Sequence, residues 1–246
     1  MDSIHLIAIS QTQNLLFISS RTYSKSIAAH LKGKVTIDLR FLNDGNLIIG
    51  ASYIPKPYFY RFLKNSYNPG LPTYITYSFT PFLELMFRYT HELNRRVIST
   101  DTYFPDRMIA LKLNLIKESQ NFPGIAFGSH DFSKLFNTSN LNINSMYSTN
   151  YIVSSKKFQT GAINLDLTLG YAFDLLSIEA RDIKGTFGGL SINTKELRNL
   201  ELLFEYDSKS KNLGIRYSIK ERLNLMVGYW DMQKLTYSIN FKLIND

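Results

Sequence analysis

The chain has 246 residues, with 17 Phe, 16 Tyr, one Trp and no Cys. The lack of cysteine excludes a disulfide framework, a thiolate metal site and a cysteine nucleophile. The net charge of +8 would suit nucleic acid, anionic lipid or an acidic polymer. Because no run of five or more basic residues occurs, nucleic acid is not an expected partner. No stretch of about 18 apolar residues is present, which excludes a membrane-spanning helix on length.

The N-terminal part of the chain gives the weakest signal. The apolar residues Leu15 to Ile18 follow the polar residues 11–14, and no Lys or Arg precedes Arg21. The segment therefore lacks the charged start of a signal peptide, so a signal, which an exported barrel needs, would have been removed or would lie outside this sequence. We interpret residues 1–44 as an N-terminal periplasmic or plug segment and residues 45–246 as one barrel domain.

From the turn signal at residues 43–46 onward, apolar and polar residues alternate with a period of two. In one such run, Leu213, Ile215 and Tyr217 alternate with Gly214 and Arg216. This period places the apolar residues on one face of a strand and the polar residues on the other. The expected strands are 46–54, 73–79, 82–91, 107–117, 124–130, 145–155, 162–173, 186–194, 200–207, 212–220, 223–230 and 235–243.

The lengths of the runs and of their connections indicate a membrane barrel. Many of the runs approach ten residues, and a tilted strand needs about 9–11 residues to cross a bilayer. Long and short connections alternate through the first eight strands, as in barrels that have loops on one rim and tight turns on the other. The final connections are all short. We therefore predict an all-β fold, a single transmembrane antiparallel meander β-barrel of about 12 strands in the bacterial outer membrane.

The polar faces of the strands would line the lumen of this barrel. Charges of both signs can line a watery path or close it as a network of ion pairs, and a barrel of this size leaves a narrow lumen. We expect a plugged or very narrow lumen, with an open pore as the alternative. The predicted lumen-lining residues are Glu84, Arg88, Lys112, Asp166, Glu201, Glu205 and Arg216.

Catalytic and metal-binding patterns are weak in this sequence. The four histidines lie far apart without a metal-ligand spacing, and no G-x-S-x-G, P-loop or G-x-G-x-x-G motif occurs. Glu201 and Glu205 lie four residues apart on one strand, so their Cα atoms would be about 13 Å apart, which is too far for a retaining glycosidase pair. We expect no enzymatic activity, no cofactor and no metal.

Several strand-and-turn segments resemble the YjbH-type family of predicted outer-membrane β-barrels. They include DGNLIIGASYIP, PFLELMFRYT, FPGIAFGSHDF, LDLTLGYA and LGIRYSIKERLNLMVGY, and the resemblance covers roughly residues 43 to 243. The family is often encoded with exopolysaccharide assembly genes and implies no catalytic residue. The resemblance thus implies a structural or conduit role in surface polysaccharide export or in a larger envelope complex. Outer-membrane lipid is the expected partner, together with envelope proteins or the polysaccharide. A general diffusion porin and a soluble ligand-binding barrel remain as alternatives.

Overall fold

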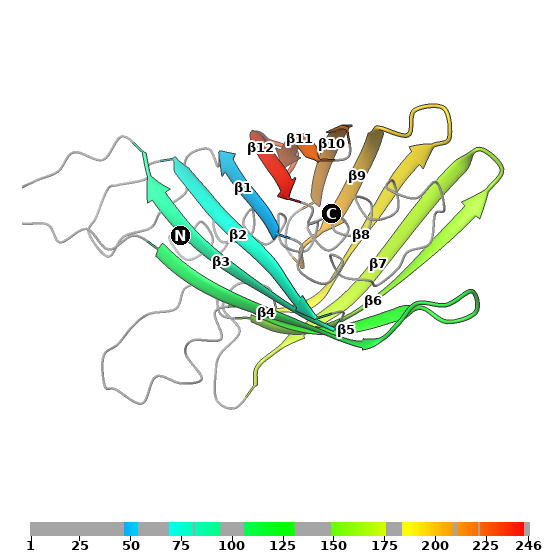
Figure 1. Cartoon of the computed structure of the whole chain (residues 1–246), viewed down its shortest axis with the longest axis horizontal. Helices are drawn as coiled ribbons and strands as arrows, with labels where there is room; N and C mark the ends of the chain where they lie inside the picture. The colour runs from blue at the N-terminus through cyan, green and yellow to red at the C-terminus, as the bar shows by residue number, and fades with distance from the viewer. Residues whose placement is uncertain are drawn as a thin grey trace, which may run out of the picture.

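The chain forms a closed antiparallel β-barrel of twelve strands (Figure 1). The computed structural model describes residues 47–53, 69–80, 82–93, 106–130, 149–175, 184–208, 211–220 and 222–243. The predicted segment 1–44 lies outside these residues and stays a prediction. The strands are β1 (Leu47–Tyr53), β2 (Gly70–Thr80), β3 (Leu83–Glu92), β4 (Asp106–Ile116), β5 (Gly124–His130), β6 (Thr149–Thr160), β7 (Ile163–Phe173), β8 (Gly185–Thr194), β9 (Leu200–Tyr206), β10 (Lys211–Ile219), β11 (Leu223–Trp230) and β12 (Lys234–Leu243).

The topology confirms the predicted all-β meander. Each strand pairs with its neighbour in sequence, and the sheet closes where β1 pairs with β12. This seam runs from the pair Leu47–Leu243 to the pair Tyr53–Tyr237. Closure leaves no unpaired edge strand, so the backbone hydrogen-bonding groups along the strands are satisfied within the sheet.

The connections define two different rims. At the short-turn rim, β2, β4, β6, β8 and β10 end and the next strand begins within eight residues. At the opposite, long-loop rim, β1, β3, β5 and β7 end and the next strand begins more than ten residues later in the sequence, whereas β9 and β11 end there and the next strand follows within five residues. Backbone hydrogen bonds tie turn residues of the short-turn rim to the neighbouring strand, such as Ser218 N of β10 to Asn199 O at 2.9 Å and Lys242 N of β12 to Arg222 O at 2.8 Å.

The sixth strand differs from its prediction. We expected a strand at 145–155 and a connection at 156–161, but β6 runs on to Thr160 and a two-residue turn at Gly161 (φ 55°) leads into β7. Lys156 and Lys157 were therefore wrongly assigned to a turn. Both residues contact the segment that follows β4: Lys156 Nζ donates to the carbonyls of Ser119 and Gln120, both at 2.7 Å, and the Lys157 backbone N–H donates to Glu118 Oε1 at 2.9 Å.

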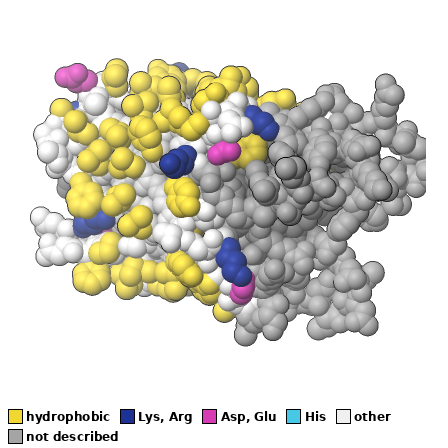
Figure 2. All heavy atoms as spheres, turned by 180° about the vertical axis from the view of Figure 1, so that it is seen from behind, with side chains coloured by type: hydrophobic (Ala, Val, Ile, Leu, Met, Phe, Trp, Pro, Cys, Tyr) yellow, Lys and Arg dark blue, Asp and Glu magenta, His cyan; other side chains and the backbone are white. Residues whose placement is uncertain are grey.

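The alternation of side chains gives the barrel an apolar outside and a polar inside. Along β10, Ile215 is 49% exposed whereas its neighbour Arg216 is 1% exposed. The same alternation recurs along β11 and β12, where Leu225, Val227, Tyr237 and Ile239 point outward. Figure 2 shows one outer face, where hydrophobic side chains cover much of the described surface and charged side chains are few. No helix in the described part of the chain is long and apolar enough to span a membrane.

Candidate functional site: the inner wall of the barrel

The inner wall contains ion pairs between residues that lie directly opposite each other on neighbouring strands. Glu84 of β3 is the register partner of Lys112 of β4, and the Lys112 Nζ lies 3.0 Å from the Glu84 Oε1. Both side chains are buried. The antiparallel register brings their Cβ atoms to about 5 Å. The alternation of each strand then turns both side chains inward.

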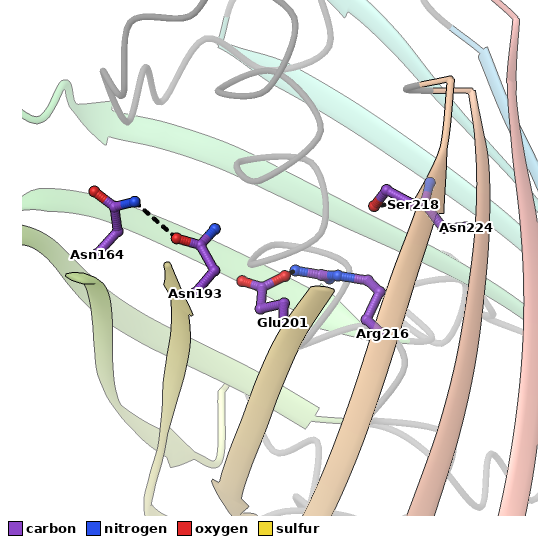
Figure 3. A network of polar contacts seen from close by, with 6 residues as sticks. All are labelled: Asn164, Asn193, Glu201, Arg216, Ser218 and Asn224. Carbon is purple, nitrogen blue, oxygen red and sulfur yellow. Dashed lines mark hydrogen bonds and ion pairs between the residues drawn. The ribbon is translucent and has the colours of Figure 1, made fainter. Parts of the chain in front are cut away.

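A second ion pair and two uncharged pairs follow the same geometry farther along the barrel (Figure 3). The Arg216 guanidinium of β10 donates to the carboxylate of Glu201 on β9, its register partner. The Asn164 Nδ2 donates to the Asn193 Oδ1 at 2.8 Å between β7 and β8. The Ser218 hydroxyl donates to the Asn224 Oδ1 at 2.7 Å between β10 and β11. All three contacts connect register partners, so they run along the wall rather than across the lumen.

The remaining predicted lumen residues also lie on the inward faces of their strands. Asp166 is buried on β7, where its register partner is Lys157 of β6, a residue that the sequence had placed in a turn. Arg88 is buried on β3 opposite Tyr74 of β2. Glu205 is half-buried on β9 near the long-loop rim. The structure therefore brings Glu84 to Lys112 and Glu201 to Arg216, and it holds the other three predicted residues at separate places on the wall.

An aromatic cluster on the inner wall was not anticipated from the sequence. It comprises Tyr74, Met86, Ala110, Ala126, Tyr151, Val153, Ala172 and Phe187, all of them buried. Three of its aromatic rings lie against inward glycines that are their register partners: Tyr74 against Gly50, Tyr151 against Gly128 and Phe187 against Gly170. A glycine inside a strand often marks the close approach of another group, so the strand glycines were the sequence feature from which this cluster could have been predicted.

Tyr74 also connects the two strands that flank the first strand. Its ring crosses β1 over Gly50, and its hydroxyl donates a hydrogen bond to the Asn240 Oδ1 on β12. Asn240 is itself the register partner of Gly50. One side chain thus spans the strands β2, β1 and β12, which form the seam where the barrel closes. Only glycine at position 50 leaves room for this arrangement, because a Cβ there would lie 2.4 Å from the Tyr74 Cζ.

No group of three or more His, Cys, Asp or Glu side chains among the described residues could hold a metal ion. Ser129 and His130 are adjacent on β5, so they point to opposite faces of the sheet and cannot form a nucleophile–base pair. The His130 ring packs inward against Tyr151 with ring centroids 5.2 Å apart. Ser129 instead donates to the Asn150 Oδ1 at 2.8 Å.

A closed barrel with apolar side chains outside and paired polar side chains inside has the architecture of transmembrane β-barrels. The model of the family described as exopolysaccharide biosynthesis protein YbjH matches residues 63–229. The chain therefore belongs to the YjbH family, in agreement with the resemblance of its strand segments.

The solved structures that are similar to the chain include two outer membrane phospholipases. The outer membrane phospholipase A of Escherichia coli has 11% identity and a TM-score of 0.43, and the alignment covers 82% of this chain and 97% of that chain. The calcium-bound outer membrane phospholipase dimer of Salmonella typhi has 11% identity and a TM-score of 0.44, with coverage of 91% and 98%. No curated protein matches the chain.

Proposed function

We propose that the chain is a non-enzymatic barrel of the bacterial outer membrane that serves surface polysaccharide export as a structural or conduit component. The proposal is supported chiefly by the distribution of side chains, which are apolar on the outside of the barrel and polar and paired on the inside. The link to export is supported by the description of the family to which the chain belongs, exopolysaccharide biosynthesis protein. In water the exposed apolar belt would drive aggregation, whereas in a bilayer it is matched by lipid. A soluble ligand-binding barrel would carry the opposite pattern.

The burial of charged side chains on the inner wall favours a closed or very narrow lumen over the open lumen of a general diffusion porin. A water-filled channel would expose its inward polar side chains to solvent. Arg216, Lys242 and Glu84 have long side chains and are nevertheless less than 2% exposed. Ion pairs between register partners also neutralise the charges that a selective pore would present to a solute.

Single cysteines can test the closed lumen, because the chain contains no cysteine of its own. Ser191 is buried on the inner face of β8, and Ser154 is half-buried on the outer face of β6. In the Ser191→Cys variant we expect slow reaction with a small, charged thiol reagent and no steady single-channel conductance. Rapid labelling together with a stable open channel would identify a porin instead. The Ser154→Cys variant controls for reagent that arrives through lipid.

The role in export is tested in the organism. Deletion of the gene is expected to reduce surface polysaccharide, and the intact chain should restore it while fractionating with the outer membrane. If the conduit form of the proposal holds, labelling of the Ser191→Cys variant should rise while polymer is exported. Normal surface polysaccharide in the deletion strain would refute the role in export. A barrel that a carbonate wash releases from membranes would refute the location.

A further inference from the structure

The outer surface of the barrel is hollowed by an apolar groove over the closure seam. The groove has a volume of about 840 Å³ and is lined mainly by outward side chains of β11, β12, β1, β2, β3 and β4, together with atoms of the inward residues Gly50, Tyr74 and Arg88. Its position follows from the register of β1 and β2, which pairs two small outward residues, Ala51 and Thr73, among larger ones. Ile239 of β12 lies on the other side of Ala51, and Phe87 of β3 lines the groove beyond β2.

The Thr73 hydroxyl in this groove already has a hydrogen-bond partner. Thr73 lines the groove, and its hydroxyl donates to the backbone carbonyl of Tyr89 at 3.0 Å. Tyr89 is the register partner of Thr73, so this hydrogen bond forms within the sheet. The groove therefore presents hydrocarbon to its surroundings and suits an apolar occupant rather than a polar one.

One end of the groove is bordered by cations. Leu223 and Phe241, which are register partners, line the groove toward the short-turn rim. The turn immediately before Leu223 carries Lys220 and Arg222, both exposed. The Arg222 carbonyl accepts a hydrogen bond from Lys242 N at 2.8 Å, which fixes this turn beside β12. By sequence Glu221 stands between the two cations, so the turn has a net charge of +1.

We propose that the seam groove binds one phospholipid with an anionic headgroup, its acyl chain along Ala51 and Thr73 and its phosphate at Lys220 and Arg222. An apolar groove that is bordered at one end by a basic turn is complementary to a lipid with acyl chains and an anionic headgroup. Arginine and lysine near a bilayer surface attract anionic headgroups. The inference rests on the membrane location proposed above, but it concerns the outside of the barrel and is independent of any role in export.

Native mass spectrometry of the purified barrel tests the proposal. The barrel is delipidated in a neutral detergent and then offered phosphatidylglycerol and phosphatidylcholine with identical acyl chains in equal amounts. We expect one phosphatidylglycerol to be retained in preference. The Lys220→Gln/Arg222→Gln variant should bind it about 25-fold more weakly, from a factor of about five for each cation. The matched control, Lys195→Gln/Arg198→Gln, removes two exposed cations from the β8–β9 turn and should retain the lipid.

A second pair of variants tests the apolar part of the groove. The Ala51→Phe substitution fills the groove and should abolish lipid retention, whereas Ser154→Phe adds the same ring to the outer face of β6 and should not. Equal retention of the two lipids, or retention that neither Ala51→Phe nor the turn variant changes, would show a non-specific annular lipid and overturn the proposal. If the spectrum instead shows a lipid-free dimer of the chain, and Ala51→Phe abolishes that dimer, the groove binds a second copy of the chain and the lipid proposal is overturned.

The two proposals fail in different ways. A chain that does not insert into phosphatidylcholine vesicles refutes the membrane location. A chain that inserts there and shows no preference for phosphatidylglycerol refutes only the lipid site.

Discussion

The contact between Gly170 and Phe187 leads to a sharp prediction about stability. A Cβ added at Gly170 would lie 2.2 Å from the Phe187 Cζ, whereas ordinary van der Waals contact begins at 3.4 Å. The ring is 1% exposed and packs edge-on against Tyr151, with centroids 5.8 Å apart, so it has little room to move away. Such overpacking costs about 1–3 kcal/mol. Replacing a strand glycine by alanine by itself stabilises the folded state by about 0.5–1 kcal/mol, because glycine loses more conformational entropy on folding. The Gly170→Ala variant should therefore lose roughly 1–2 kcal/mol of unfolding free energy.

Denaturant unfolding in lipid vesicles measures this loss, and the fluorescence of Trp230 reports it because this residue is the only tryptophan and is buried. Gly214→Ala is the matched control, since the nearest atom to its added Cβ would be the Leu203 Cβ at 3.5 Å. The control should be neutral or stabilising by up to about 1 kcal/mol. In a Phe187→Ala background, Gly170→Ala should no longer destabilise. Equal effects of the two alanine substitutions, or additive effects in the double variant, would refute the reasoning.

Three further predictions concern the ion pairs, the seam and the outer surface. Arg216→Met leaves the Glu201 carboxylate buried without its partner and should lose about 3–5 kcal/mol of unfolding free energy, most of which a second substitution, Glu201→Leu, should restore. Tyr74→Phe removes the hydrogen bond to Asn240 and should lower the unfolding free energy by about 1–2 kcal/mol. If Tyr74→Phe costs just as much in an Asn240→Ala background, the hydrogen bond does not account for the loss. Ile215→Arg places a charge among the outward apolar residues of β10 and should cost about 2–4 kcal/mol in vesicles, whereas a gain in solubility without any loss of vesicle insertion would contradict the membrane location.

The number and order of the strands could be predicted because the alternation of residues is a local property of the sequence. The strand predicted at 223–230 has the same bounds in the structure, and the one predicted at 162–173 differs by a single residue. Each strand of a membrane barrel must match lipid on one face, so its pattern is enforced along most of its length. The error at β6 arose where two lysines interrupt the pattern, and the contacts that accommodate Lys156 come from residues 119 and 120, far away in sequence.

The pairing of inner-wall residues could not be predicted in the same way, because it depends on register. The sequence identified Glu201 and Arg216 as inward, but only the alignment of β9 with β10 places them opposite each other. The same limit applies to Tyr74, whose hydroxyl meets a residue 166 positions later in the chain. The glycine at position 50 was visible in the sequence. The reason for this glycine, the Tyr74 ring that crosses over it, depends on the pairing of β1 with β2 on one side and with β12 on the other.

The location of the charges at register positions determines what they can contribute to function. A cation and an anion about 3 Å apart act at a distance as a dipole, so a pair such as Lys112 and Glu84 exerts little net field on a solute in the lumen. The same pair is very sensitive to alignment, because a slip of β3 against β4 by one residue would separate the two charges and turn one of them toward lipid. The interior charges therefore specify the register of the barrel far more strongly than they select a solute. Under the proposed role in export, selection of a polymer would fall to the rims, where charged side chains such as Lys195 and Lys220 are exposed.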